Sequence, residues 1–499
     1  MTAVELRFLE KEYWYGGYVT EGVRQPYGAE SDVVLDLTQN STPNQAMPLF
    51  VSTHGRWLWQ DRGFPVQFKK GVIDCPDDVE IGKAGDSLRT AYSGAMKKHF
   101  PFHPCHLAPQ MFQTPVYNTW IELTFYQTQQ AVLNYAENIV RNGLPAGVLI
   151  IDDGWSDYYG KWSFSRESFS APEQMLRQLH EWGFFVMVWV CPFITPDTLV
   201  YRELKEQNLL VKNGCGEVHI AHWWNGWSAV LDLSKAAARS WLDKQMDELR
   251  KLGVDGFKFD AGDSTYYPVD GEISPDGHSG FWAAYGERFH FNEFRVTTKA
   301  GGWSLMQRLC DKDHSWGETG LAALIPDALI QNLTGHPFCS PDMIGGGEYR
   351  NFLSQTSLDP ELFLRHTEVA CLMPVMQFSA APWRVLSSPY FDRIKNLVQI
   401  RNKYWEEINR AIQLCRETGE PILRPLEYEF PNQGWAQVMD EFMLGDALLV
   451  APILVKNTNV RQVAIPKGCW GWKDAIIEST GMILEITTEQ GDLIVLRKL

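Results

Sequence analysis

Two carboxylates and a lysine end a short, mostly apolar segment, residues 253–263 (GVDGFKFDAGD). Because side chains alternate across a strand, Lys258 and Asp260 point to the same side of it. A cation beside a carboxylate favours the ionised form, so Asp260 is suited to act as a nucleophile. The following Ala261 and Gly262 leave room for a ligand. The alternative interpretation is that Asp260 only caps a turn, as Asp often does after a strand.

The elements that position these residues alternate between strand and helix from about residue 116 onward. Alternating β and α units with apolar strands predict a parallel sheet, and the length of the region suits a barrel. The predicted strands are residues 117–125, 147–153, 184–190 and the strand that ends at Asp260; the predicted helices are residues 132–140, 172–182 and 236–252.

Shorter segments of β type flank this region on both sides. Before it, residues 32–37, 64–68 and 71–74 alternate in polarity between Gly, Pro and Asn residues, and after it residues 442–451, 461–465 and 492–497 do the same. We therefore predict an α/β fold in which a (β/α)8 TIM barrel, residues 113–405, is flanked by β-sandwich-type domains. The N-terminal β domain, residues 1–112, is short, and the C-terminal β domain comprises residues 406–499.

The composition limits the kind of ligand. A formal net charge of −16 without a Lys/Arg-rich stripe argues against nucleic acid and against an anionic membrane, and favours a neutral ligand. The 20 Trp, 18 Tyr and 26 Phe residues supply flat rings that suit the C–H faces of sugars, although most must serve the core. We expect neither a metal nor another cofactor, and the oligomeric state stays open.

The expected location is the cytoplasm. The first residues contain no basic segment followed by an apolar run, and no apolar segment reaches the length needed to span a bilayer. Nine scattered cysteines without a CxxC pattern are typical of reduced thiols rather than of disulfides or a zinc site.

Several motifs resemble glycoside hydrolase family 31, the retaining α-glycosidases built on a (β/α)8 barrel. The segment around Asp260 resembles the nucleophile strand of that family, and residues 151–155 (IDDGW) resemble its sugar-binding strand end and the same motif of related α-galactosidase families. Further similar segments are residues 13–17, 119–120, 192–196, 376–383, 418–425 and 442–452. The resemblance is best over residues 115–470 and is nearest to the α-galactosidase-like branch of the family.

This resemblance implies a retaining mechanism with two carboxyl groups about 5 Å apart, one as nucleophile and one as acid/base. It assigns the nucleophile to Asp260. For the acid/base we favour Asp313, because it precedes Asp342 of residues 337–346 (PFCSPDMIGG) by about the distance found in the family. Asp311 is the second choice and Glu318 the third.

The side chains expected to bind substrate are acids, two cations and tryptophans near these strand ends. They are Asp152, Asp153, Trp155, Trp189, Lys258, Arg308, Trp316 and Asp342, with Trp223 and Trp224 as further stacking candidates. Any of the tryptophans could instead belong to the core, Arg308 could be a structural ion-pair partner, and Asp342 could orient its neighbours.

Residues 377–379 (QFS) stand where α-glucosidases of the family carry Arg-Asn-His, so a histidine that contacts glucose is missing. Together with the Asp-Asp-Gly-Trp motif, this favours α-galactosides over α-glucosides and α-xylosides. Two rivals come from other classes. A metal-dependent lyase or isomerase could hold a hard cation on Asp152, Asp260 and Asp313, and a catalytically silent sugar-binding protein could keep the same fold.

Overall fold

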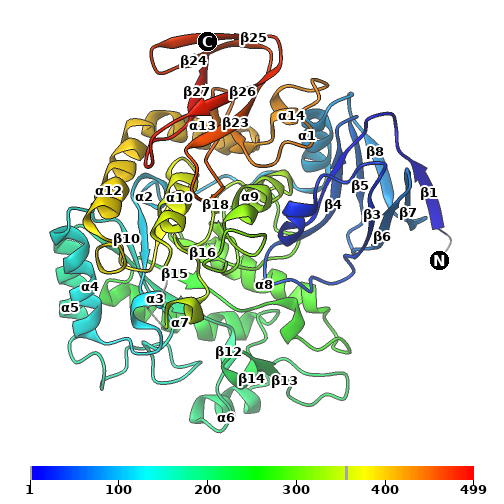
Figure 1. The fold of residues 1–499 in the computed structure, drawn as a ribbon. Helices are drawn as coiled ribbons and strands as arrows, with labels where there is room; N and C mark the ends of the chain where they lie inside the picture. The colour runs from blue at the N-terminus through cyan, green and yellow to red at the C-terminus, as the bar shows by residue number, and fades with distance from the viewer. Residues whose placement is uncertain (1–2, 354–357) are drawn as a thin grey trace.

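Eight parallel strands form the centre of the computed structural model, which describes residues 3–353 and 358–499. Figure 1 shows the fold. The order of the eight strands in the sheet is β18-β17-β16-β15-β11-β10-β9-β19, and a parallel bridge between Met343 and Gln377 brings its two ends together. The strands are β9 (Val116–Asn118), β10 (Val148–Ile151), β11 (Phe185–Val190), β15 (Gly256–Phe259), β16 (Asn292–Phe294), β17 (Gln307–Arg308), β18 (Cys339–Ser340) and β19 (Gln377–Phe378). The predicted (β/α)8 barrel is confirmed.

The helices surround this sheet; α3 to α10 lie between successive barrel strands, and α11 and α12 follow the last one. They are α3 (Trp120–Leu123), α4 (Gln129–Arg141), α5 (Pro172–Glu181), α6 (Leu199–Glu206), α7 (Ala236–Leu252), α8 (Pro275–Glu287), α9 (Leu324–Leu333), α10 (Pro360–Cys371), α11 (Pro382–Val385) and α12 (Ser388–Lys403). Short 3-10 turns are η2 (Ser264–Tyr266), η3 (Leu321–Ala323) and η4 (Tyr349–Phe352), and a small sheet of β12 (Phe193–Ile194), β13 (Ile220–Trp223) and β14 (Gly226–Val230) follows β11.

Local sequence explains where these helices begin and end. The hydroxyl of Thr128 accepts a hydrogen bond from the backbone N–H of Ala131 and so caps α4, while α5 begins with Pro172, whose missing N–H costs nothing there. Helix α7 ends at Gly253, whose φ of 115° lies in the left-handed region that glycine adopts without strain. These signals account for the close agreement with the predicted helices.

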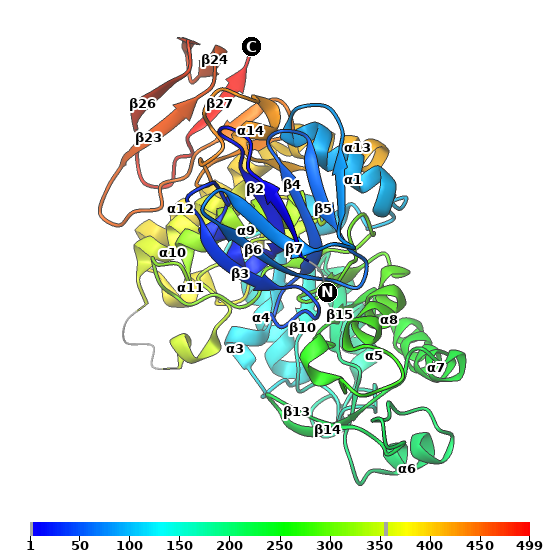
Figure 2. The ribbon, with the colours of Figure 1, turned by 90° about the vertical axis from the view of Figure 1, so that its right-hand side faces the viewer.

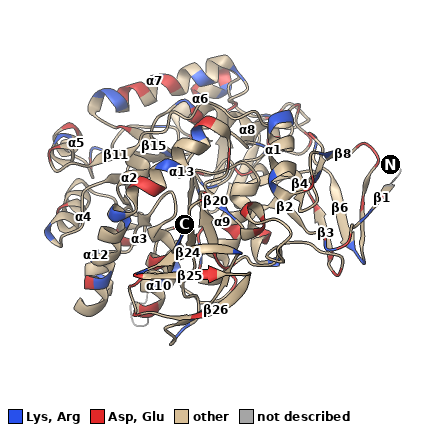
Figure 3. Ribbon diagram, turned by 90° about the horizontal axis from the view of Figure 1, so that it is seen from above, with Lys and Arg blue, Asp and Glu red and all other residues tan. Residues whose placement is uncertain are grey.

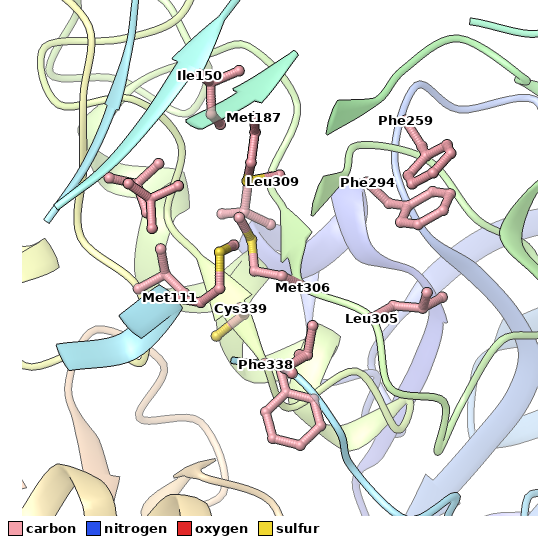
Figure 4. Close-up of a cluster of buried hydrophobic side chains, with 14 of the residues drawn as sticks. Met111, Ile150, Met187, Phe259, Phe294, Leu305, Met306, Leu309, Phe338 and Cys339 are labelled. Atoms are coloured by element: carbon pink, nitrogen blue, oxygen red, sulfur yellow. The ribbon is translucent and has the colours of Figure 1, made fainter. Parts of the chain in front are cut away.

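The barrel strands place an apolar layer beneath a polar one. Ile150 of β10 and Met187 of β11 lie opposite each other in register, and Figure 4 shows them among the buried apolar side chains. Two residues further along, the same faces carry Asp152 and Trp189, and Trp189 is in register with Lys258 of β15. A dry layer therefore supports the chemical groups at the strand ends.

Two predicted strands differ from the observed elements. Strand β9 covers only Val116–Asn118, because the side-chain oxygen of Asn118 accepts the backbone N–H of Trp120 and the chain turns into α3. Residues 442–451 form a hairpin rather than one strand, with Gly445 at a φ of 59° in the turn between β21 (Phe442–Leu444) and β22 (Leu448–Val450).

The N-terminal region is a sandwich of two four-stranded antiparallel sheets (Figure 2). One contains β1 (Ala3–Arg7), β7 (Val72–Pro76), β6 (Pro65–Lys69) and β3 (Asp32–Asp36), and the other β2 (Trp14–Tyr18), β4 (Ala46–Ser52), β5 (Arg56–Trp59) and β8 (Glu80–Lys83). Aromatic rings fill the space between them, with Tyr27 and Phe68 stacked at 4.6 Å. Three further short elements belong to this end of the chain: η1 (Val19–Arg24), α1 (Leu88–His99) and α2 (Gln110–Gln113).

The C-terminal β domain begins later than expected. Residues 405–418 form helix α13 (Trp405–Thr418), and the strands start at β20 (Leu423–Arg424). A six-stranded sheet also includes β21, β22, β27 (Val495–Lys498), β24 (Gly468–Trp472) and β25 (Ala475–Ser479), and β23 (Val460–Ile465) pairs with β26 (Met482–Thr487); helix α14 (Leu426–Glu429) follows β20.

Charged residues of both signs share the outer surface (Figure 3). On α7, for example, Arg250 pairs with Asp247 and Lys251 with Glu248. Within the described ranges, no helix combines the length and apolar character that crossing a membrane requires.

Candidate active site

A cavity of about 470 Å³ opens at the carboxyl ends of the barrel strands. Of the candidates from the sequence, the structure brings together in its lining Asp152, Asp153, Trp189, Trp224, Lys258, Asp260, Arg308 and Asp311. The C-terminal end of a barrel of this type is where catalytic groups are placed. The cavity is therefore the candidate active site.

The carboxylate of Asp260 is almost fully buried and receives several donors. Trp189 Nε1 donates to Oδ2 at 3.0 Å, Arg295 Nε donates to Oδ1 at 3.0 Å, and Lys258 Nζ lies 3.8 Å from Oδ2. Burial opposes ionisation, but the charges of Arg295 and Lys258 outweigh it and hold the pKa of Asp260 well below its ordinary value. The cavity therefore presents a carboxylate that is ionised around neutral pH.

A second ionic pair lies beside it. Lys258 Nζ donates to Asp152 Oδ2 at 2.7 Å, and both side chains are buried. Asp153 accepts hydrogen bonds from Tyr159 Oη at 3.0 Å and Asn225 Nδ2 at 2.8 Å. Burial, followed by repulsion from Asp152, raises the pKa of Asp153 to about 7. Asp153 can therefore hold a proton near neutral pH and offer a sugar a donor as well as an acceptor oxygen.

Asp311 is more exposed to solvent than the carboxyl groups of Asp152, Asp153 and Asp260. Its side chain is 42% exposed, and its Oδ1 accepts a hydrogen bond from Arg308 Nη1 at 2.8 Å. Arg308 is buried and also donates to Asp342. The carboxyl group of Asp311 can therefore reach both solvent and a ligand, as a group that exchanges protons must.

Asp342 does not line the cavity. It is fully buried, and its Oδ2 accepts the backbone N–H groups of Lys312 and Gly347, each at 2.8 Å. Burial raises the pKa of Asp342 to about 7, with Arg308 acting against the rise. This carboxyl group orients Arg308 and the loop that carries Asp311, so the expected contact with substrate is corrected to a positioning role.

The preferred acid/base candidate lies elsewhere. Asp313 is outside the cavity, where its Oδ1 accepts only a long 3.5 Å bond from Asn351 Nδ2 and its backbone N–H bonds to Thr319. Glu318 is likewise absent from the lining. Of the three sequence candidates, the structure places only Asp311, the second choice, inside the cavity.

Three of the tryptophans predicted to contact substrate lie outside the cavity lining. Trp155 is fully buried, donates to the backbone oxygen of Trp189 at 2.8 Å and packs against Phe164. Trp223 packs against other aromatic rings of the core, and Trp316 donates to Asp359 at 2.9 Å outside the cavity. Trp155 supports the wall from behind, and of the five tryptophans predicted from the sequence only Trp189 and Trp224 line the cavity.

The main omission of the sequence analysis is Arg295, which directly follows β16 and binds the nucleophile candidate. It also donates to both oxygens of Asp263, at 3.1 and 2.9 Å, and to the backbone oxygen of Pro43 at 2.7 Å. The same strand-end rule that selected Asp260 would have found it, had residues 292–294 been predicted as a strand. Other unpredicted lining residues include Trp120, Asn225, Tyr266, Glu348, Tyr349 and Arg350.

The segment that departs from the α-glucosidase pattern lies beneath the site. Gln377 donates to Glu293 at 2.8 Å, and Ser379 accepts the backbone N–H of Ile121 at 2.8 Å. Neither residue lines the cavity, so no side chain of residues 377–379 stands in for the missing histidine.

Comparisons with known proteins agree with this architecture. Models of the "Glycosyl hydrolases family 31 TIM-barrel domain" and the "Glycosyl hydrolase family 31 C-terminal domain" match residues 109–296 and 419–494. The chain is 34% identical over 425 residues to the myogenesis-regulating glycosidase of Mus musculus, which covers 80% of this chain and 58% of that protein. It is 24% identical over 391 residues to alpha-glucosidase 2 of Bacillus thermoamyloliquefaciens, covering 71% of this chain and 48% of that protein. The chain thus spans only about half to three fifths of the length of these relatives.

Solved structures share the fold. The cycloalternan-degrading enzyme from Trueperella pyogenes superposes with a TM-score of 0.81 at 18% identity, covering 100% of this chain and 81% of that one. A GH31 alpha-xylosidase from a soil metagenome, complexed with xylose, gives a TM-score of 0.81 at 19% identity and covers 99% and 79% of the two chains.

Proposed function

The chain belongs to glycoside hydrolase family 31, and we propose that it is a retaining α-glycoside hydrolase with Asp260 as nucleophile and Asp311 as acid/base. The observation that carries the proposal is the contrast between two carboxyl groups of one cavity. Asp260 is buried among cations that keep it ionised, while Asp311 is partly exposed and bonded to one guanidinium. Different environments for two acids are what a double displacement requires.

In the first step an oxygen of Asp260 attacks the anomeric carbon, and the departing glycosidic oxygen takes the proton of Asp311. In the second step Asp311 removes a proton from water, whose oxygen attacks the same carbon and releases Asp260. A solved complex of the cycloalternan-degrading enzyme from Trueperella pyogenes contains a covalent intermediate, which supports this route by analogy. Arg295 and Lys258 stabilise the carboxylate that leaves in the second step.

For the sugar, we propose an α-galactoside or a related neutral α-linked substrate. Two observations support this proposal. No side chain of residues 377–379 lines the cavity, and both acids of the Asp-Asp-Gly-Trp motif do. Trp155 of the same motif is not part of the argument, since it belongs to the core. α-Glucosides and α-xylosides are the alternatives within the family. They are favoured by similarity to alpha-glucosidase 2 and to the alpha-xylosidase XylQ of Lactiplantibacillus pentosus, which is 22% identical over 463 residues.

The geometry does not favour a metal-dependent reaction. Asp152 and Asp260 are each paired with a cationic side chain, and Asp313, the third expected ligand, lies outside the cavity. In the part of the chain that the structure describes, no group of three or more His, Cys, Asp or Glu side chains is arranged to hold an ion.

The first experiment is hydrolysis of p-nitrophenyl α- and β-glycosides of galactose, glucose, xylose and N-acetylgalactosamine, with and without chelator. Release from one α-glycoside at the same rate with chelator supports the class and identifies the sugar. Activity only with a divalent cation would instead favour the lyase or isomerase alternative, and silence across the panel would favour a sugar-binding protein.

Asp311→Ala and Asp313→Ala form a matched pair for the acid/base. We expect Asp311→Ala to lose roughly 10²–10⁴-fold in kcat/KM on glycosides with poor leaving groups, and far less on glycosyl fluorides, which need no protonation. Asp313→Ala should stay near the wild type on both. The reverse ranking would return the role to Asp313.

A further inference from the structure

We propose that Glu293, a buried residue beneath the cavity, is a positioning residue whose negative charge links the nucleophile to the acid/base through the cations Lys258 and Arg308. This inference rests on the proposed function and adds a residue to its mechanism. Glu293 is fully buried and does not line the cavity, so it acts on the reaction only through these two neighbours.

The register of the barrel strands places Glu293 between the two cations. Strand β16 pairs with β15 so that Glu293 and Lys258 are direct partners, and their side chains therefore lie on the same face of the sheet. On its other side β16 pairs with β17, whose Arg308 places Nε 3.5 Å from Glu293 Oε1. The carboxyl group of Glu293 is thus flanked by one cation from each neighbouring strand.

Each cation leads on to one of the two acids proposed for catalysis. Lys258 Nζ lies 3.8 Å from Asp260 Oδ2, and Arg308 Nη1 donates to Asp311 Oδ1 at 2.8 Å. The charges from nucleophile to acid/base therefore alternate in sign, in the order Asp260, Lys258, Glu293, Arg308 and Asp311. Arg308 repels the charge of Lys258, and the anion between them offsets this repulsion in a buried region where charges interact strongly.

Glu293 acts on Arg308 through charge rather than through a hydrogen bond. Among the residues that the structure describes, Glu293 Oε1 and Arg308 Nε both lack a hydrogen-bond partner, although they lie only 3.5 Å apart. The other carboxyl oxygen, Oε2, accepts a hydrogen bond from Gln377 Nε2 at 2.8 Å. A glutamine at position 293 could accept the same bond, so Glu293→Gln removes the charge and leaves the hydrogen bonds in place.

Other titratable groups face the same network. Burial raises the pKa of Glu293, Lys258 and Arg308 act against the rise, and Asp152 adds to it. The groups that interact with Asp311 include Arg308, Arg295, Asp342 and Cys310, and Glu348 and Arg350 line the same cavity. Glu293→Gln alters none of these groups, so its only electrostatic effect is to make the surroundings of Arg308 and Asp311 more positive.

The test is kcat/KM against pH for two substrates of one sugar, the methyl α-glycoside and the α-glycosyl fluoride. Methanol is a poor leaving group and needs the proton of Asp311, whereas fluoride does not. In Glu293→Gln the basic limb for the methyl glycoside should move to lower pH by about one unit, because a more positive site releases this proton more easily. The profile for the fluoride should keep its shape.

Glu368→Gln is the matched control. Glu368 is also a buried carboxyl group beside a buried arginine, and it accepts hydrogen bonds from Arg365 Nη1 at 3.1 and 2.9 Å, but it lies on α10 outside the cavity lining. Its replacement should lower the melting temperature and leave the basic limb where it is. Glu293→Asp keeps the charge, so its basic limb should also stay at the position of the wild type.

An unmoved basic limb in Glu293→Gln, or an equal displacement in Glu368→Gln, would overturn the proposal. If thermal melting shows that Glu293→Gln does not fold, Gln377→Leu takes its place. This change removes the hydrogen bond that favours ionised Glu293, so the limb should move in the same direction by less, and an unmoved limb would again overturn the proposal. Failure of the proposed function looks different: Asp311→Ala would keep its activity on the methyl glycoside, or the wild type would hydrolyse no α-glycosyl fluoride. Either result would remove the reaction in which Glu293 is given a role.

Discussion

Replacing Arg295 by Met tests whether the charge of this residue keeps the nucleophile ionised. Arg295 donates to Asp260 at 3.0 Å and lies in the same buried cluster as Lys258. After the ordinary effect of burial, Arg295 is the largest influence on the pKa of Asp260, and it lowers that pKa. Loss of an opposite charge at this distance shifts a pKa by about 1–3 units. In Arg295→Met the pKa of Asp260 should therefore rise toward or above its ordinary value of 3.8.

The assay is kcat/KM against pH for an α-glycosyl fluoride, because this substrate does not need the proton of Asp311. An acid limb that reports Asp260 should lie below the accessible pH range in the wild type and move upward by about 1–3 units in Arg295→Met. The direction of the change follows from the sign of the pKa shift. A carboxyl group whose pKa is lowered in the folded protein stays ionised until the pH falls through that pKa, and the stability that its ionised form contributes is lost only then. An acid limb identical to that of the wild type would refute the argument.

Stability provides the second readout. Arg295→Met also leaves Asp263 buried without its two donors, and removing one member of a buried ion pair costs about 3–5 kcal/mol. Adding Asp263→Asn should recover much of that loss in thermal melting but leave the displaced acid limb unchanged. The double variant thus separates the effect on folding from the effect on the nucleophile.

Two further changes test buried charges near the site. Asp153 has a folded pKa of about 7, raised from 3.8, so its ionisation makes wild-type stability fall as pH rises between these values. The melting temperature of Asp153→Asn relative to the wild type should therefore be higher at pH 8 than at pH 4, and a pH-independent difference would contradict this. Lys312 Nζ binds Asp327 Oδ2 at 2.6 Å in the core, so Lys312→Met should cost about 3–5 kcal/mol and Lys312→Met with Asp327→Leu should cost much less. Equal melting temperatures of the single and double variants would show that the pair is not coupled.

The barrel could be predicted because its strongest signals are local. The amphipathic period and the terminal Gly253 determine α7, which the structure reproduces over Ala236–Leu252. The run VLII of β10 is buried on both faces, as expected for a central parallel strand. Asp260 followed from the same reasoning, because it directly continues β15 along the strand direction.

The acid/base could not be decided in this way. Asp311 and Asp313 follow a strand of only two residues, and in the loop beyond it no alternation indicates which side chain faces inward. The choice depends on contacts between distant segments: Arg308 binds Asp311, and Asp342 binds the N–H between the two candidates. The tryptophans raised a similar difficulty, because a ring that stacks on a sugar and a ring that fills the core have the same sequence signature. The cytoplasmic location stays a prediction.

The N-terminal domain is part of the site, and this is the feature furthest from what local sequence can reveal. Asn44 donates to the backbone oxygens of Arg295 and Arg308 at 2.8 and 3.2 Å and accepts the N–H of Cys310 at 3.1 Å. These bonds join segments about 250 residues apart, yet they hold residues at the ends of two neighbouring barrel strands. Pro43 also lines the cavity, and its backbone oxygen accepts a hydrogen bond from Arg295, so the N-terminal domain helps to hold Arg295 and Arg308 beside Asp260 and Asp311. The barrel therefore supplies the two acids proposed for catalysis, and the neighbouring domain contacts the cations beside them.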